Sequence, residues 1–144
     1  MKLFKTMAAL AALVGLAATA ASAGPGTHSV GVIQIKQTFM ADIDEGYVTP
    51  GPAADLWFEA ASPGHFFLTP VHGAQFALQG TTQPDYATCQ TAGYSGSKIP
   101  LSAAPVYTYV CVRTNHGRYA QFRIDGMTTA GPLKVLVINH RTWN

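Results

Sequence analysis

The stretch FMADIDEGYV, residues 39–48, carries carboxylates at a spacing that could bind a cation. Three of the seven acidic residues of the chain, Asp42, Asp44 and Glu45, fall within four positions, and a glycine follows directly. An EF-hand loop requires glycine at its sixth position and glutamate at its twelfth. Counted from Asp42, the glycine is fifth and the twelfth residue is an alanine, so this motif is absent.

A strand over residues 38–44 would place Asp42 and Asp44 together on one solvated face, because successive side chains of a strand alternate. The opposite face would then point inward and carry the apolar residues Phe39, Ala41 and Ile43. The two carboxylates leave open a Ca²⁺ site, while nothing else in the sequence indicates a cofactor.

Trp57 marks a second candidate site, in the predicted strand 54–60 (ADLWFEA). Asp55 and Glu59 would flank it on the outward face. A tryptophan between acids is typical of a surface that stacks on a sugar or binds a cation, and it is also typical of an aromatic that covers a sheet. If this strand lies beside the previous one, Asp55 and Glu59 would join the same carboxylate patch.

The clearest local structure is a hairpin over residues 106–125, VYTYVCVRT-NHG-RYAQFRID. A three-residue loop with a left-handed glycine, here Gly117, is a recognised connection between paired strands. The predicted register puts on one face the pairs Thr114/Arg118, Val112/Ala120, Val110/Phe122 and Thr108/Ile124. The other face would carry Arg113/Tyr119, Cys111/Gln121, Tyr109/Arg123 and Tyr107/Asp125.

This second face of the hairpin is a third candidate site, because it mixes aromatic and polar side chains. Its candidate binding residues are Tyr107, Tyr109, Tyr119 and Arg123. Tyrosine and arginine are enriched where proteins dock partners. The same residues could simply cover the sheet, so both interpretations stay open.

The sequence shows no arrangement typical of an enzyme. The five histidines lack metal-ligand spacing, and neither a G-x-S-x-G motif nor a glycine-rich phosphate loop is present. A glycosidase would need two carboxyl groups across a cleft, and no feature of the sequence marks one. A small secreted hydrolase is therefore the weakest alternative, and we predict no catalytic residue.

Residues 1–23 are predicted to be a secretory signal peptide. Lys2 and Lys5 precede an apolar run over residues 7–20, and Ala-Ser-Ala at 21–23 is a small-residue cleavage site. The run is shorter than the roughly 20 residues that a membrane-spanning helix needs. We predict one exported domain, residues 24–144, which is secreted or periplasmic and does not span a membrane.

The charge of the chain depends on this segment. Without its two lysines the chain has seven basic and seven acidic residues, so its formal net charge is zero, which disfavours a nucleic-acid partner. Residues 24–66 carry one basic and five acidic residues, and residues 106–144 carry five basic and one acidic residue. This division predicts either ion pairs within the domain or self-association into a surface layer or filament.

The overall pattern predicts an all-β fold, a single-domain antiparallel sandwich or partly open barrel, because short alternating runs recur between Gly, Pro and Asn. One short helical turn is expected at 84–92. Cys89 and Cys111 are predicted to form a disulfide, since cysteines of exported chains usually pair. The strand 133–142 is apolar on both faces and should be central. The other predicted strands are 29–36, 65–70, 74–79, 106–114 and 118–125.

The motif CVRTNHGRYAQFRID, with the earlier cysteine in YATCQTA and the pieces ADIDEG and ADLWFEA, resembles a bacterial exported β-module of uncharacterised function. The resemblance covers residues 36–143. It implies the β fold, the disulfide and export, and it brings no catalytic residues. We predict a non-catalytic module that binds an extracellular protein or a glycan.

Overall fold

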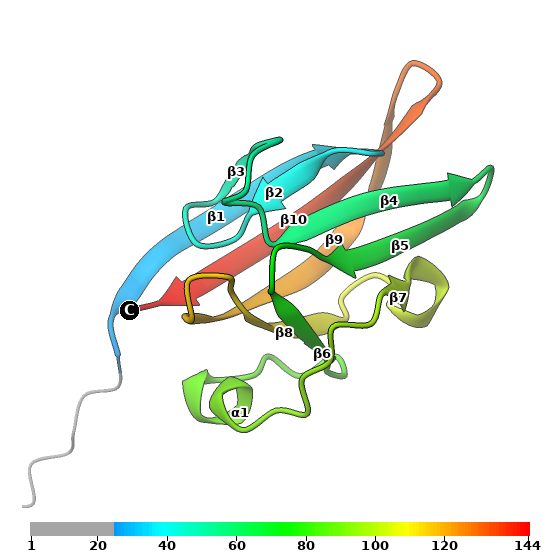
Figure 1. Ribbon diagram of the computed structural model, residues 1–144. Coiled ribbons are helices and arrows are strands. Elements are labelled where there is room, and N and C mark those ends of the chain that lie inside the picture. Colours follow the sequence, from blue (N-terminus) through cyan, green and yellow to red (C-terminus); the bar gives the residue numbers. More distant parts are fainter. Residues whose placement is uncertain (1–24) are drawn as a thin grey trace, which may run out of the picture.

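The computed structural model describes residues 25–144 and consists of two antiparallel sheets packed face to face (Figure 1). The predicted signal peptide lies outside the described residues. Sheet A contains, in spatial order, β1 (Thr27–Lys36), β10 (Leu133–Trp143), β9 (Tyr119–Ala130), β8 (Tyr109–Arg113) and β6 (Gln75–Leu78). Sheet B contains β3 (Tyr47–Val48), β2 (Met40–Asp42), β4 (Leu56–Ser62), β5 (His65–Pro70) and β7 (Ile99–Pro100). The predicted all-β sandwich is confirmed.

The core lies between the two sheets and is built by the alternation of side chains along the strands. In β8 and β9 the inward residues Val110, Val112, Ala120 and Phe122 are 0% exposed. Sheet B contributes Leu56, Phe58 and Leu68, which are also fully buried. Each large apolar side chain buried in this way contributes about 1.5–3 kcal/mol.

The β8–β9 hairpin has the predicted register. Val110 pairs with Phe122, Val112 with Ala120 and Tyr109 with Arg123. The predicted pair Tyr107/Asp125 is wrong, because Tyr107 has a positive φ of 71° and leaves the ladder. Its N–H donates instead to the carbonyl of Ile124. The strand therefore begins at Tyr109.

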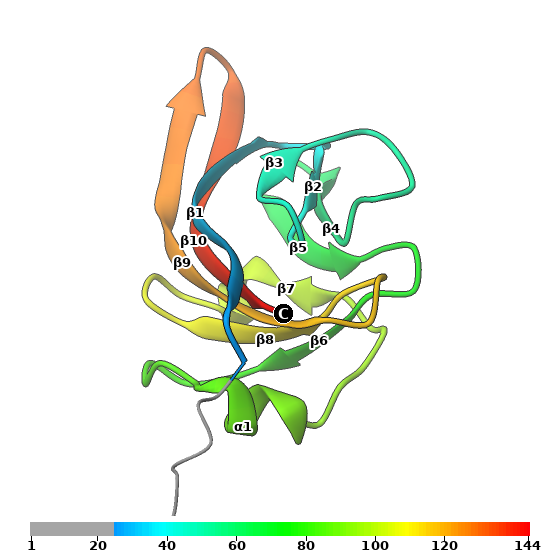
Figure 2. The ribbon, with the colours of Figure 1, turned by 90° about the vertical axis from the view of Figure 1, so that its left-hand side faces the viewer.

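Strand β10 is central, as predicted, and it lies between β1 and β9. Strands β9 and β10 continue past the other strands as a hairpin that projects from the sandwich (Figure 2). Figure 2 also shows sheet A curving around sheet B, so that β1 and β3 lie on the same side of the molecule.

Helix α1 (Tyr86–Gln90) covers part of the outer face of sheet A, and a 3-10 turn spans Leu101–Ala103. Asp85 caps α1 by accepting the N–H of Thr88 at 2.8 Å. The predicted disulfide joins Cys89 of the helix to Cys111 of β8. Within residues 25–144, no helix is long and apolar enough to cross a membrane.

The predicted strand over residues 38–44 is shorter than expected. A turn at Gln37–Thr38, with φ of +73° at Thr38, moves the start of the strand to Met40. Strand β2 therefore spans only three residues. Phe39 precedes β2 and is 48% exposed, so its predicted inward position is wrong. Ala41 and Ile43 are buried in the core as predicted.

Candidate functional site

Three aspartates from different segments meet inside the molecule. Asp42 ends β2, Asp44 lies in the turn that follows, and Asp55 directly precedes β4. One carboxylate oxygen of each lies within 4.8 Å of the others, and the residues are 1%, 0% and 0% exposed. The predicted solvated positions of all three are therefore wrong. Because β2 ends at Asp42, the chain turns back over the core and carries its carboxylates inward.

Asp44 is held by the loop of the β8–β9 hairpin. Its Oδ1 accepts hydrogen bonds from Thr114 Oγ1 at 3.0 Å and from the Arg118 guanidinium at 3.3 Å. Its Oδ2 lies 2.9 Å from His116 Nδ1, and this hydrogen bond raises the pKa of His116. The acidic and basic segments of the chain thus pair within one domain, which is the first of the two predicted outcomes of the charge division.

Asp55 connects the turn after β2 with the loop of the β8–β9 hairpin, by accepting hydrogen bonds from backbone N–H groups of both. Its Oδ2 accepts the N–H of Ile43 at 2.8 Å, and its Oδ1 accepts the N–H of Asn115 at 2.7 Å. The pKa of Asp55 is raised to about 6, mainly by burial and also by the charges of Asp44 and Asp42, against the opposing effect of the two N–H groups. Burial also raises the pKa of Asp42.

Strands β1 and β10 contact the same turn from the other side. Ser29 Oγ donates to the Asp44 carbonyl at 2.6 Å, and Thr142 Oγ1 donates to the Ile43 carbonyl at 2.5 Å. A Cβ on Gly46, whose φ is +82°, would lie 2.6 Å from the His140 ring. The aspartate cluster is therefore the point at which loops of both sheets are tied together. A Ca²⁺ ion at Asp42 and Asp44 would share the Asp44 oxygens with Thr114, His116 and Arg118, while Asp42 accepts the N–H of Glu45 at Oδ1.

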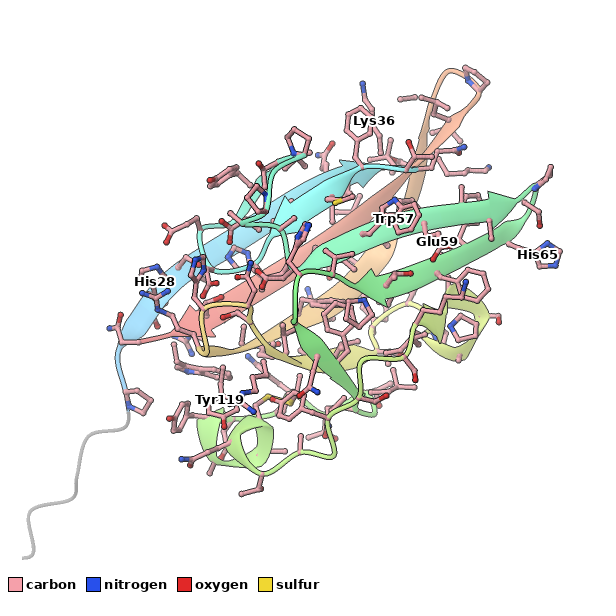
Figure 3. The ribbon with its side chains drawn as sticks, viewed as in Figure 1. His28, Lys36, Trp57, Glu59, His65 and Tyr119 are labelled. Atoms are coloured by element: carbon pink, nitrogen blue, oxygen red, sulfur yellow. A yellow bond between two sulfur atoms is a disulfide. The ribbon has the colours of Figure 1, made fainter. Side chains whose placement is uncertain are left out.

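Trp57 lies on the outer face of sheet B with Glu59, on the same strand (Figure 3). Its indole N–H donates to the Thr38 carbonyl at 3.0 Å, so the polar edge of the ring is already bonded within the protein. Glu59 accepts Thr69 Oγ1 at 2.6 Å and lies 3.4 Å from Lys98 Nζ. Glu59 stays outside the aspartate cluster, and Asp55 does not flank Trp57. This geometry favours the interpretation in which Trp57 covers the sheet.

A polar pocket lies on the outer face of sheet A. Tyr109, Arg123 and Asn139 form a row across β8, β9 and β10, because Arg123 pairs with both neighbours. Gln121 lies in the next row, and Gln83 approaches from the loop before α1. These five residues enclose about 160 Å³.

Gln121 distinguishes this pocket from the other hollows of the surface. The residue is 4% exposed, and its Oε1 atom is buried without a hydrogen-bond partner in the described part of the chain. Leaving a buried polar group unpaired costs about 1–3 kcal/mol, so folded proteins rarely do so. This oxygen is shielded from solvent, so a ligand in the pocket would remove the cost once the Gln121 side chain turns toward it.

Arg123 is oriented by its neighbours on the same face. Its Nε donates to Asp125 Oδ1 at 2.6 Å, and its guanidinium carbon lies 5.7 Å from the centre of the Tyr107 ring. The structure thus brings together three of the four candidate residues on this face, Tyr107, Tyr109 and Arg123. The Arg123 guanidinium is thus held in place before a ligand binds.

Tyr119, the fourth candidate residue, belongs to the covered part of the sheet. Its ring packs edge-to-face on Tyr86 of α1, with 5.8 Å between ring centres, and Tyr86 packs in turn on Trp143. Figure 3 shows Tyr119 beside the helix. For Tyr119 the structure supports the interpretation as a covering residue.

The polar pocket continues along the start of α1. A second hollow of about 360 Å³ shares Gln83 with it and adds Arg141 and Trp143 to its lining. Arg141 pairs with Gln121 in the β9–β10 ladder, so the two hollows are neighbours. Together they form a groove with amide, guanidinium and aromatic groups.

A larger hollow lies elsewhere, beside the β4–β5 turn. It encloses about 660 Å³ and is lined mainly by apolar residues such as Phe66, Phe67 and Met127. None of its lining residues has an unpaired buried polar atom. We therefore take the smaller polar pocket as the candidate site, since its chemistry is the more specific.

Three residues of the pocket were absent from the sequence-based candidates. Gln121 was placed on the correct face by the predicted hairpin register, and its alignment with Tyr109 and Arg123 was the available signal. Asn139 required the β9–β10 register, which includes a bulge between Val137 and Ile138. Gln83 lies in a loop without a periodic pattern.

Comparison of the chain with protein-family models, with curated proteins and with solved structures gives no match.

Proposed function

We propose that the chain is an exported, non-catalytic module that binds a saccharide in the polar pocket of sheet A. The observation that carries this proposal is the unpaired Oε1 of the buried Gln121, surrounded by Tyr109, Arg123 and Asn139. A hydroxyl or an acetamido N–H of a sugar would donate to this oxygen once the Gln121 side chain turns toward the pocket, since the oxygen is buried in the free protein. The disulfide is consistent with an oxidising compartment and therefore with export.

The lining of the groove favours a saccharide over a peptide. Every residue around the pocket carries a hydrogen-bonding side chain, and none is aliphatic. Peptides are usually recognised by pockets for apolar side chains or by pairing at a sheet edge. Sugars instead require several fixed donors and acceptors, together with an aromatic face such as that of Tyr109.

The proposal is tested by calorimetric titration with two matched probes, the β-1,4-linked trimer of N-acetylglucosamine and cellotriose, which carries a 2-hydroxyl in place of each 2-acetamido group. We expect at least one probe to bind, and Gln83→Ala to weaken its affinity about 3- to 10-fold, which corresponds to one lost hydrogen bond. Gln83 is exposed, so the variant should fold. Gln34→Ala removes an exposed glutamine of β1, outside the pocket, and should bind as the wild type does.

Trp57→Ala separates this site from the outer face of sheet B. If that variant loses probe binding while Gln83→Ala retains it, the binding site is on sheet B and the proposal fails. Failure of both probes and of a wider panel of neutral and acidic oligosaccharides would also contradict it. Binding of an extended peptide that Gln83→Ala abolishes would identify a different ligand class and overturn the saccharide assignment.

A further inference from the structure

Strand β1 presents an unpaired edge. It is the outermost strand of sheet A and has β10 as its single ladder partner. The N–H of Gln37 donates to the Lys134 carbonyl, so the β1–β10 register continues past Lys36. This bond shows that the odd-numbered residues of β1 are the ones whose backbone groups face β10. In an antiparallel ladder the backbone groups of alternate residues point to opposite sides. Those of Val30, Val32 and Gln34 therefore point away from β10, and among the described residues no group bonds to them.

The side chains along this edge are apolar and exposed. Val30 is 65% exposed and Val32 is 57% exposed. Strand β3, the edge of sheet B on the same side (Figure 2), adds Tyr47 at 50% and Val48 at 38%. Soluble proteins normally protect such an edge with inward charges, prolines or bulges, because an open edge pairs with other strands. The middle of β1 has none of these devices between residues 30 and 35.

The charges at the two ends of β1 are complementary. At the start of the strand, His28 Nε2 lies 2.8 Å from Glu45 Oε1, and Glu45 is half-exposed. At its end, Lys36 is exposed and has no carboxylate partner among the described residues. Figure 3 shows His28 and Lys36 at opposite ends of the strand. An antiparallel copy of β1 would exchange these ends.

We propose that two copies of this chain pair through β1, antiparallel about a two-fold axis at Val32. This register places Val32 beside Val32 of the second copy and Val30 beside its Gln34. Each Lys36 then lies beside the His28–Glu45 pair of the other copy. The two five-stranded sheets A become one continuous sheet of ten strands. A second copy is the partner that fits. Two-fold symmetry places the apolar centre of one β1 against the apolar centre of the other, and the basic end of each strand against the acidic end of its partner.

This dimer differs from a filament of head-to-tail copies. A two-fold interface uses the same surface on both copies and closes after two chains. The assembly should therefore stop at the dimer at all concentrations. The interface uses no residue of the polar pocket, so the dimer and the proposed saccharide binding can fail independently.

The oligomeric state is measured by sedimentation equilibrium of the exported protein over a wide concentration range. We expect a monomer–dimer equilibrium whose dissociation constant increases with salt, since Lys36 and Glu45 are exposed and screened. Lys36→Glu and Glu45→Lys should each weaken the dimer about 5- to 10-fold, and the double reversal should restore it. Lys98→Glu, at an exposed lysine that lies beside Glu59 on sheet B and away from β1, is the control and should leave the dimer unchanged.

Val32→Lys should abolish the dimer without unfolding the chain, because this side chain is exposed in the monomer. Hydrogen exchange gives a second readout that does not depend on a variant. The N–H groups of Val30, Val32 and Gln34 should exchange more slowly as concentration rises. A monomer at all concentrations, or a dimer that Val32→Lys leaves intact, overturns the proposal.

Discussion

At the scale of single residues, polar groups buried in this molecule fall into two kinds. The aspartate cluster is bonded to protein donors, with Asp44 and Asp55 each using both carboxylate oxygens. Gln121 instead keeps a buried oxygen without a partner, as does Asn115 in the hairpin loop beside the aspartate cluster. The first kind stabilises the contact between loops of the two sheets. The second kind costs stability in the free protein and is the kind of group that a ligand would satisfy.

Replacing Gln121 with methionine should separate the effect of its unpaired oxygen on stability from its effect on saccharide binding. Methionine has a similar shape and no hydrogen-bonding requirement, so Gln121→Met should leave the free energy of unfolding unchanged or raise it by about 1 kcal/mol. Binding of the saccharide probe should fall at least tenfold. Urea denaturation and calorimetric titration of the same samples measure both effects. A loss of about 2 kcal/mol or more would show that the Gln121 amide is bonded in the free protein.

Asp55 should make the folded protein less stable as the pH rises. Its pKa is about 6 in the folded state and 3.8 in the unfolded reference, so the folded state binds more protons between these values. Stability from this group is complete below about pH 4 and is lost as the pH passes 6, at a cost of about 3 kcal/mol. The raised pKa values of Asp42 and His116 act in the same direction, while the lowered pKa of His140 opposes them.

Urea denaturation at several pH values between 4 and 7 measures this effect, with Asp55→Asn as the comparison. The variant loses a backbone acceptor and should be less stable at every pH. It should also lose most of the decline between pH 4 and 7 that the wild type shows. An equal decline in both proteins would assign the pH dependence to other groups.

At the scale of elements, the local pattern of the sequence determined most strands. The β8–β9 hairpin was predictable with its register, because a one-residue slip would have placed Arg113 or Arg123 in the core. The central position of β10 followed from apolar residues on both of its faces. The turns around β2 were not predictable, since Thr38 adopts its positive φ in a tertiary context. The burial of Asp44 likewise depends on Thr114, which lies 70 positions away in the sequence.

The disulfide holds α1 against sheet A together with the packing of Tyr86 on Tyr119 and Trp143. The bond closes a loop of 22 residues, for which the loss of chain entropy in the unfolded state predicts about 3 kcal/mol of stabilisation. We expect Cys89→Ala/Cys111→Ala to lose about that amount in urea denaturation. Because the segment before α1 supplies Gln83 to the pocket, saccharide binding should weaken as well. A double variant with full binding would show that the wall of the pocket is independent of the helix.

At the scale of the whole molecule, sheet A has two separate surfaces. The polar groove occupies the outer face near α1, and the open edge at β1 lies on the far side of β10. Antiparallel pairing of two copies about an axis normal to the sheet would put both grooves on the same side of the dimer. If the saccharide proposal also holds, the dimer would bind a repeating polymer at two points, and its avidity would exceed the affinity of one groove.

The position of the ligand is the claim on which this account depends most, and nuclear magnetic resonance titration with the saccharide probe tests it most directly. The account predicts that the side-chain amide signals of Gln121, Asn139 and Gln83 shift on binding, together with the backbone signals of Tyr109 and Arg123. The indole signal of Trp57 should stay in place, because its N–H is bonded to Thr38. Shifts centred on Trp57 and Glu59, with Gln121 unchanged, would contradict the account.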